Sequence, residues 1–389
     1  MTASTHTNGT NGVHASPNRK KPSRFFNDYG VWKEAPILVG STKFEPLPEA
    51  KNIMITGGAG FIACWLVRHL TLTYPHAYNI VSFDKLDYCS SLNNTQRHNI
   101  DTIFHFAAQS HVDLSFGNSY GFTHTNVYGT HVMLESAKKV GIKRFIHIST
   151  DEVYGEVKDG DDDLLETSIL APTNPYAASK AAAEMLVYSY MKSFKLPVII
   201  VRSNNVYGPH QYPEKIIPKF TCLLNRKRPA VLHGDGSPTR RYLFAGDAAD
   251  AFDTILHKGT LGQVYNVGSY DEISNIDLCR MLLKEMEIVH EDPAEFSKWI
   301  KYTHDRPFND HRYAVDGTKL RQLGWEQKTS FAEGLKITVE WYKRFGEEWW
   351  GDISKVLSPF PIVIETEVHS DKEEICDEPI SAKKRKVSD

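Results

Sequence analysis

Apolar runs of strand length alternate with helical patterns along the first half of the chain. The run NIMIT at 52–56 predicts a buried strand, and the segment 61–74 places Leu66, Val67 and Leu70 on one face of a helix. Because strands that alternate with helices form parallel sheets covered on both faces, the pattern predicts an α/β protein with a doubly wound parallel sheet. Further apolar runs predict strands at 80–83, 102–107, 144–148 and 197–201, with helices at 126–140 and 176–194.

The pattern changes after residue 205, where loops rich in proline and glycine separate shorter helices near 245–258, 274–287 and 331–345. We expect this part to form a smaller mixed α/β lid that completes a substrate site. The predicted division is a cofactor domain at 49–205 and a substrate-binding region at 206–346, interleaved with the sheet. Polar segments at 1–48 and 347–389 read as largely disordered tails.

Charge and composition exclude several classes of protein. A formal net charge of -3 gives no basic field for nucleic acid, and no apolar run reaches the roughly 18 residues of a membrane span. The polar N-terminus lacks the apolar centre of a secretory signal, so we expect a cytoplasmic protein. A basic run at 383–387 is typical of a solvated terminus, with nuclear import as a minor alternative. Five scattered cysteines without CxxC spacing support neither a disulfide framework nor a metal site.

A glycine turn follows the first strand directly and opens the first helix. Gly57 and Gly60, with Phe61 and Ile62 next to them, belong to the stretch GGAGFI. A turn without side chains lets a pyrophosphate approach the backbone, and the helix N-terminus adds free N–H groups. Asp84, at the end of the second strand, can accept both ribose hydroxyls and repel a 2′-phosphate. The pattern therefore favours NAD over NADP, although Lys85 could offset part of that repulsion.

Tyr176 and Lys180 lie four residues apart, so both face one side of a helix. A nearby cation lowers the pKa of a phenol, which lets the tyrosine take a proton from a substrate hydroxyl. The spacing alone is more often a surface pair. Thr150, Asp151 and Glu152 add weight, because they follow the strand at 144–148 and so lie at the ligand edge of the sheet. The alternative for the two carboxyls is a solvated turn or a helix cap.

Seven stretches in this order, GGAGFI, HFAAQSHVD, STDEVYG, NPYAASK, NNVYG, YPEK and RPFNDHRY, resemble the nucleotide-sugar 4,6-dehydratases of the extended short-chain dehydrogenase/reductase superfamily. The resemblance covers about 51–345. It implies a Rossmann fold and a hydro-lyase with tightly bound NAD, acting on UDP-glucose or dTDP-glucose as in rhamnose biosynthesis. The RPFND stretch favours UDP-glucose. Asp151 would protonate the departing 6-hydroxyl, Glu152 would remove the C-5 proton, and Tyr176 would oxidise C-4 with NAD.

The resemblance also implies binding roles and a homodimer built from the helices at 126–140 and 176–194. Structural roles remain as alternatives to these binding roles. Asn126 could cap a helix, and histidines such as His105 and His111 are more often structural than ligands. The residues expected to hold NAD beyond the glycine turn, Asp84 and Lys85 are Ala107, Ala108, Gln109, Asn126, Tyr176 and Lys180. Those expected to hold the nucleotide sugar are Ser110, Asn205, Glu214, Lys215, Arg240, Asn266 and Arg306, with Arg241 and Arg312 as further phosphate ligands.

One departure from the family pattern lies between Asp84 and Thr102, where only 17 residues stand. A helix, a third strand and a second helix need about 50 residues there, so the third-strand region reads as deleted around 94–98. The missing segment carries an adenine contact in the family. Two alternatives follow: a nucleotide-sugar epimerase or decarboxylase, from which Glu152 separates a dehydratase, and a non-catalytic relic with impaired cofactor binding.

Overall fold

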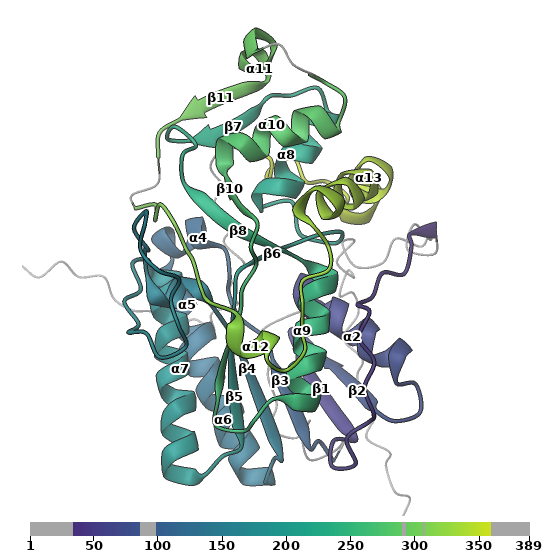
Figure 1. The fold of residues 1–389 in the computed structure, drawn as a ribbon, viewed down its shortest axis with the longest axis vertical. Coiled ribbons are helices and arrows are strands. Elements are labelled where there is room, and N and C mark those ends of the chain that lie inside the picture. Colours follow the sequence, from purple (N-terminus) through teal and green to yellow (C-terminus); the bar gives the residue numbers. More distant parts are fainter. Residues whose placement is uncertain (1–33, 86–98, 290–292, 306–307, 359–389) are drawn as a thin grey trace, which may run out of the picture.

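The computed structural model describes residues 34–85, 99–289, 293–305 and 308–358. Within these ranges a parallel sheet of six strands forms the centre, in the order β2-β1-β3-β4-β5-β9 (Figure 1). The predicted parallel α/β sheet is therefore confirmed. Its strands are β2 (Asn79–Phe83), β1 (Asn52–Thr56), β3 (Thr102–His105), β4 (Arg144–Thr150), β5 (Val198–Ser203) and β9 (Val264–Val267).

Both faces of the sheet are covered, as alternating strands and helices require. Ile53 and Ile55 of β1 pack into a cluster with α2 (Phe61–Thr73) and α9 (Ala245–Lys258). Met54, which points the other way, joins a second cluster with α6 (Gly129–Val140) and α7 (Pro175–Phe194). Because side chains alternate between the two faces of a strand, β1 contributes side chains to the hydrophobic clusters on both faces of the sheet.

Strand β2 forms one edge of the sheet, and the described residues hold no strand beyond it. The expected deletion around 94–98 falls on a segment outside those residues. Sequence reasoning missed β9, which is only four residues long and pairs with β5 through a parallel register, Ile200 with Val264.

The lid lies above the carboxyl ends of the strands (Figure 1). It contains a three-stranded and a two-stranded sheet among the described residues. The strands are β6 (Asn205–Tyr207), β8 (Thr239–Phe244) and β10 (Glu272–Ser274) in one sheet, and β7 (Ala230–His233) and β11 (Ile300–Thr303) in the other. The helices are α8 (Ile216–Asn225), α10 (Asn275–Glu285), α11 (Pro293–Trp299) and α13 (Phe331–Trp350), while α12 (Thr318–Arg321) lies beside the sheet.

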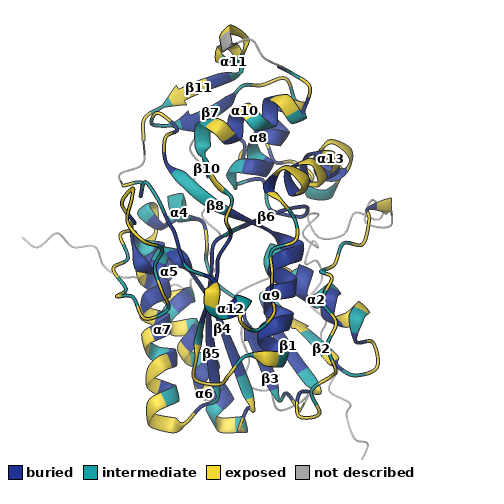
Figure 2. Ribbon diagram, in the orientation of Figure 1, coloured by how far each residue is buried: buried dark blue, intermediate teal, exposed yellow. Residues whose placement is uncertain are grey.

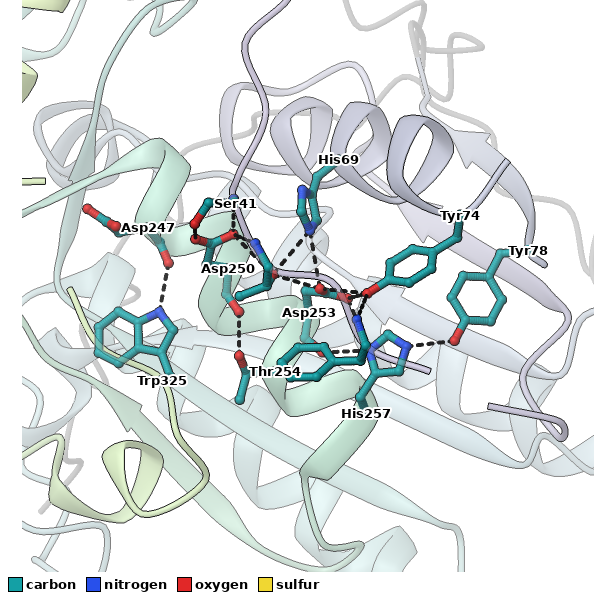
Figure 3. Close-up of polar contacts among 12 residues, drawn as sticks. Ser41, His69, Tyr74, Tyr78, Asp247, Asp250, Asp253, Thr254, His257 and Trp325 are labelled. Carbon is teal, nitrogen blue, oxygen red and sulfur yellow. Dashed lines mark hydrogen bonds and ion pairs between the residues drawn. The ribbon is translucent and has the colours of Figure 1, made fainter. Parts of the chain in front are cut away.

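The ordered body extends past the predicted domain limits at both ends. Asp250 of α9 accepts hydrogen bonds from the backbone N–H groups of Ser41 (2.5 Å) and Thr42 (2.9 Å) (Figure 3). At the other end, Ile353 and Leu357 are buried beyond α13. The structure differs from the expected tails at 41–48, where a side-chain carboxylate binds the backbone, and at 347–358, where Ile353 and Leu357 pack into the hydrophobic core. No helix in the described ranges combines the length and the apolarity that a membrane crossing needs.

Candidate active site

A cleft of about 1360 Å³ separates the carboxyl ends of the central strands from the lid. Both walls contribute polar residues, and the glycines of the described lining, Gly57, Gly60 and Gly129, come from the sheet side, as expected for a site at the ligand edge of an open sheet. The residues predicted from sequence that line it are Gly57, Gly60, Phe61, Ile62, Asp84, Lys85, Ala107, Ala108, Ser110, Thr150, Glu152, Tyr176, Lys180, Asn205, Glu214, Lys215 and Arg240.

The glycine turn leaves room that a side chain would fill. Gly57 has a φ of 70°, and a Cβ atom there would lie 3.0 Å from the backbone of Ala107. Gly60 begins α2 without a side-chain cap, and Asp84 Oδ2 accepts a hydrogen bond of 3.0 Å from the N–H of Ala59 between these glycines. A narrow cradle at a helix N-terminus fits the pyrophosphate of a dinucleotide.

Helix α7 carries Tyr176 and Lys180 into the cleft one turn apart. It begins at Pro175, and the side chain of Asn174 caps it by accepting from the N–H of Ala177 (2.9 Å). The Lys180 ammonium donates to the carbonyl oxygen of Ile148 in β4 (2.6 Å), and burial lowers the pKa of Lys180 to about 8.

The expected effect of Lys180 on Tyr176 is not present in this arrangement. Burial raises the pKa of the Tyr176 phenol, and the charges of Glu152 and Asp151 raise it further. A hydrogen bond with Thr150 acts in the opposite direction. The phenol therefore needs additional positive charge in the cleft before it can act as a base near neutral pH.

Asp151 and Glu152 begin the short helix η2 (Asp151–Tyr154) directly after β4, where the Thr150 hydroxyl accepts from the N–H of Glu152 (3.3 Å). Asp151 is 2% exposed, and burial followed by the charge of Glu152 raises the pKa of Asp151 to about 7. Burial also raises the pKa of Glu152, while Asn174 donates to its Oε2 atom (3.2 Å). Asp151 can thus hold a proton near neutral pH.

Asn126 and Gln109 support the cleft from behind and are not among its described lining residues. Asn126 lies in the π-helix η1 (Thr123–Tyr128), a rare geometry that often marks functional sites. Its amide exchanges two hydrogen bonds with the backbone of Gln109 (2.7 and 3.0 Å) and donates to Ser179 Oγ of α7 (2.8 Å). Asn126 therefore ties the loop after β3 to the helix that carries Tyr176, and the alternative of a helix cap does not hold.

Only part of the expected phosphate clamp faces the cleft. Lys215 Nζ donates to the carbonyl oxygen of Ser110 (2.7 Å), and the Arg240 guanidinium lies 4.7 Å from the centre of the Tyr313 ring. Arg241 and Arg312 instead pair with acidic side chains outside the cleft. These pairs join Arg241 to Asp163 (2.5 Å) and Glu272 (3.2 Å), and Arg312 to Glu272 (2.8 Å).

Two further predicted substrate ligands, Asn266 and Arg306, are not among the described residues that line the cleft. Asn266 is buried beside the sheet, where it accepts from the Tyr154 hydroxyl (2.9 Å) and donates to the carbonyl oxygen of Leu164 (3.0 Å). Its side chain is occupied by the fold and is absent from the described cleft lining. Arg306 lies outside the described residues.

Sequence reasoning missed the asparagines that hold the two carboxyls. Asn204 Nδ2 donates to Asp151 Oδ2 (2.6 Å), and Asn174 reaches Glu152 as described above. Asn174 could have been found, since an Asn followed by Pro is a typical helix start. Asn204 is the residue before Asn205 in the stretch NNVYG, and its partner is 53 positions away.

Comparison with known proteins shows related chains along most of this body. The family model described as GDP-mannose 4,6 dehydratase matches residues 75–338. A trifunctional UDP-glucose 4,6-dehydratase/UDP-4-keto-6-deoxy-D-glucose 3,5-epimerase/UDP-4-keto-L-rhamnose-reductase of Arabidopsis thaliana is 49% identical over 342 residues, covering 80% of this chain and 50% of that protein. The chain thus spans about half the length of this plant relative. The dTDP-D-glucose 4,6-dehydratase of Homo sapiens is 44% identical over 339 residues, covering 80% and 95%.

Solved structures show the same architecture. The dTDP-glucose 4,6-dehydratase DesIV from Streptomyces venezuelae, solved with NAD bound, has a TM-score of 0.70 and 35% identity, and the match covers 77% of this chain and 99% of that chain. A UDP-glucose 4-epimerase from Thermotoga maritima has a TM-score of 0.68 and 29% identity over 76% and 100% of the two chains.

Proposed function

Because this chain belongs to the nucleotide-sugar 4,6-dehydratase family, we propose that it removes water from UDP-glucose to form UDP-4-keto-6-deoxyglucose, with NAD as its cofactor. The observation that carries the proposal is the carboxyl pair behind Thr150. Asp151 holds a proton near neutral pH, and Glu152 lines the cleft beside it. Dehydration needs one acid and one base, and this pair supplies both.

Each residue then has one task. When bound, NAD would supply a reversible hydride acceptor for C-4 and C-6, so that no net NADH forms. Tyr176 takes the proton of the 4-hydroxyl. Lys180 provides a positive charge one helical turn away from Tyr176 on α7. The new ketone acidifies C-5, Glu152 removes that proton, and Asp151 supplies the proton with which the 6-hydroxyl leaves as water.

The substrate side of the cleft suits a sugar diphosphate. Lys215, Lys219 and Arg240 are cationic side chains of the lid that line the cleft, and we assign the diphosphate to Lys215 and Arg240. Ser110, Asn205 and Glu214 would bind the sugar hydroxyls. The similarity to plant enzymes named for UDP-glucose, together with the RPFND stretch, favours UDP-glucose, with dTDP-glucose as the next candidate.

The edge position of β2 bears on cofactor affinity. We propose that the shortened segment after Asp84 removes the adenine contact of the family, so that NAD is held through the glycine turn, Asp84 and the nicotinamide end. Affinity for NAD would then be weaker than in relatives with a full-length segment. Retention of stoichiometric NAD through dialysis of the purified protein would contradict this part of the proposal.

One experiment tests the function and its alternatives together. The protein is incubated with UDP-glucose or dTDP-glucose in D₂O with added NAD, and the products are examined by mass spectrometry and NMR. We expect a 4-keto-6-deoxy sugar with deuterium at C-5 and no net NADH absorbance. The matched variant Glu152→Gln should lose both product and deuterium incorporation.

The other outcomes assign the alternatives. An epimerised sugar that retains its oxygen at C-6 would support the epimerase reading, which the 29% identity to a UDP-glucose 4-epimerase keeps in view. No product from either sugar, together with no measurable NAD binding, would support a non-catalytic relic.

We also propose a homodimer in which α6 and α7 pack against the same helices of a second copy. Helix α7 turns an exposed face outward (Figure 2) that carries Met185 (54% exposed) and Tyr188 (47% exposed). Exposed apolar side chains grouped on one helix are typical of an interface. Light scattering should give twice the chain mass, and Met185→Asp with Tyr188→Asp should give the monomer.

A further inference from the structure

The proposed acid Asp151 is not at the surface of the cleft. Thr150 and Glu152 are among the described residues that line the cleft, whereas Asp151 is not. Its side chain is enclosed, with Asn204 on Oδ2 (2.6 Å) and the Thr150 hydroxyl on Oδ1 (3.2 Å). The Thr150 hydroxyl therefore lies between the Oδ1 atom of Asp151 and the cleft.

Asn204 determines which oxygen of Asp151 carries that proton. The Oδ1 atom of Asn204 accepts from the backbone N–H of Ser269 (2.7 Å), so its NH₂ group faces Asp151. An amide NH₂ only donates, and Oδ2 of Asp151 must therefore accept. The proton is left on Oδ1, which is the oxygen next to Thr150.

The Thr150 hydroxyl has the right number of bonding positions for a relay. A hydroxyl accepts twice and donates once. Thr150 Oγ1 accepts from the N–H of Glu152 (3.3 Å) and donates to Oδ1 of ionised Asp151 (3.2 Å). When Asp151 carries the proton, this bond reverses: Oδ1 donates to Thr150, and the hydrogen of Thr150 is available to the cleft. The Tyr176 phenol is on that side, hydrogen-bonded to Thr150.

One proton must move from Tyr176 to Asp151 after each turnover. In the dehydration proposed above, Tyr176 gains the proton of the 4-hydroxyl and Asp151 loses one to the departing water. Glu152 takes the C-5 proton and, after exchange with solvent, returns one proton to C-5, and the hydride returns to C-6. After one turnover Tyr176 thus holds one proton too many, and Asp151 one too few.

We propose that the Thr150 hydroxyl relays protons among Asp151, the 6-oxygen of the sugar and Tyr176, an inference that rests on the proposed function. During elimination, Thr150 gives its hydrogen to the 6-oxygen and takes the proton of Asp151, while the C-6–oxygen bond breaks and water leaves. During reset, Tyr176 gives its proton to Thr150, and Thr150 gives its own to Asp151. Both residues return to their starting state without exchange with bulk water.

The test compares Thr150→Val, which keeps the shape without the hydroxyl, with Thr150→Ser, which keeps the hydroxyl. Both are measured in single turnovers with enzyme in excess, on the accepted nucleotide-glucose and on its 6-deoxy-6-fluoro analogue. Fluoride leaves without a proton, so the analogue does not need the relay during elimination. NADH absorbance follows oxidation at C-4, and quenched samples give the amount of 4-keto-6-deoxy product.

With the natural sugar, we expect Thr150→Val to accumulate NADH and to form product about 100-fold more slowly than Thr150→Ser, the size typical of general acid catalysis. With the fluoro sugar, the two variants should differ by less than about threefold. The relay is overturned if Thr150→Val is slowed equally with both leaving groups, because the hydroxyl then serves oxidation alone, or if Val and Ser match on the natural sugar. Wild-type protein that dehydrates neither UDP-glucose nor dTDP-glucose would overturn the proposed function instead, and the relay with it.

Discussion

Two buried aspartates of this chain, Asp151 and Asp253, have pKa values that are shifted in opposite directions. Asp151 lies under the cleft, and burial raises its pKa to about 7, with the charge of Glu152 adding to the effect. Asp253 lies on α9 (Figure 3) and is not among the described residues that line the cleft. Burial alone would raise its pKa too, but hydrogen bonds from His257, His69 and Thr42 lower it to about 2.

The difference comes from the donors that surround each carboxyl. Asp253 accepts from Thr42 Oγ1 (2.7 Å) and the Tyr74 hydroxyl (3.0 Å), and it contacts His69 (3.2 Å) and His257 (3.0 Å). Among the described residues, Asp151 is hydrogen-bonded to Asn204 and Thr150, and a second carboxyl lies beside it. Burial therefore does not decide the charge of a carboxyl, whereas the number of donors does. One aspartate is poised for proton transfer and the other holds the fold together.

The largest expected effect is on catalysis at Asp151. Asp151→Asn keeps the size of the side chain and removes the acid, so kcat should fall by about 100- to 10,000-fold. In the wild type, kcat should also decline as pH rises past about 7, because Asp151 then loses its proton. Steady-state assays across pH give both results, with urea unfolding as the control for folding. An Asp151→Asn enzyme with wild-type kcat would remove Asp151 from the mechanism.

The matching change at Asp253 should act on stability. Asp253→Ala leaves His69, Tyr74 and Thr42 without their shared acceptor, and breaking a buried network costs about 3 kcal/mol of unfolding free energy. Urea unfolding followed by circular dichroism measures this loss. The protein that remains folded should keep its kcat, since Asp253 does not line the described cleft. A large loss of kcat without a loss of stability would reverse the roles assigned to the two aspartates.

This contrast also marks how far sequence reasoning reaches. The strands at 52–56 and 80–83, the glycine turn and the Thr150–Glu152 stretch follow from local patterns, and the structure brings the glycine turn, Thr150 and Glu152 to one cleft. Asp151 was predicted because it directly follows a strand and lies in the stretch STDEVYG, which resembles the family. The setting that raises its pKa was not found, because Asn204 comes from another strand.

The remaining contacts could not be predicted, because they join residues that are far apart in the sequence. Thr42 and Asp253 are 211 positions apart, so the arm at 41–48 looked like part of a polar tail. The sequence predicted Arg241 as a phosphate ligand, but in the structure its guanidinium pairs with Asp163, which is 78 positions away. Periodicity reports which face of an element is buried, but it does not report which polar group will meet another.

A smaller effect should appear in the pH dependence of stability. The pKa of Asp253 is lowered in the folded state, so its stabilising contribution is complete above the unfolded value near 4 and is lost as pH falls toward about 2. This contribution is on the order of 2 kcal/mol. Urea unfolding at several values between pH 5 and pH 2 should show the wild type losing more stability than Asp253→Asn. Parallel curves for the two proteins would mean that Asp253 is not ionised by its donors.

The smallest expected effect concerns the arm itself. Thr42→Val removes one hydroxyl from Asp253 and from Asp250 (3.1 Å) while keeping the shape of the side chain, and should cost about 1 kcal/mol of unfolding free energy. The pKa of Asp253 should rise slightly, because two histidines and Tyr74 still surround it. Lys43→Ala, at the exposed neighbouring position, serves as the matched control and should change stability by less than about 0.5 kcal/mol. If the two variants were equally stable, the donors of α2 and α9 alone would keep Asp253 ionised, and the difference from Asp151 would not depend on the arm.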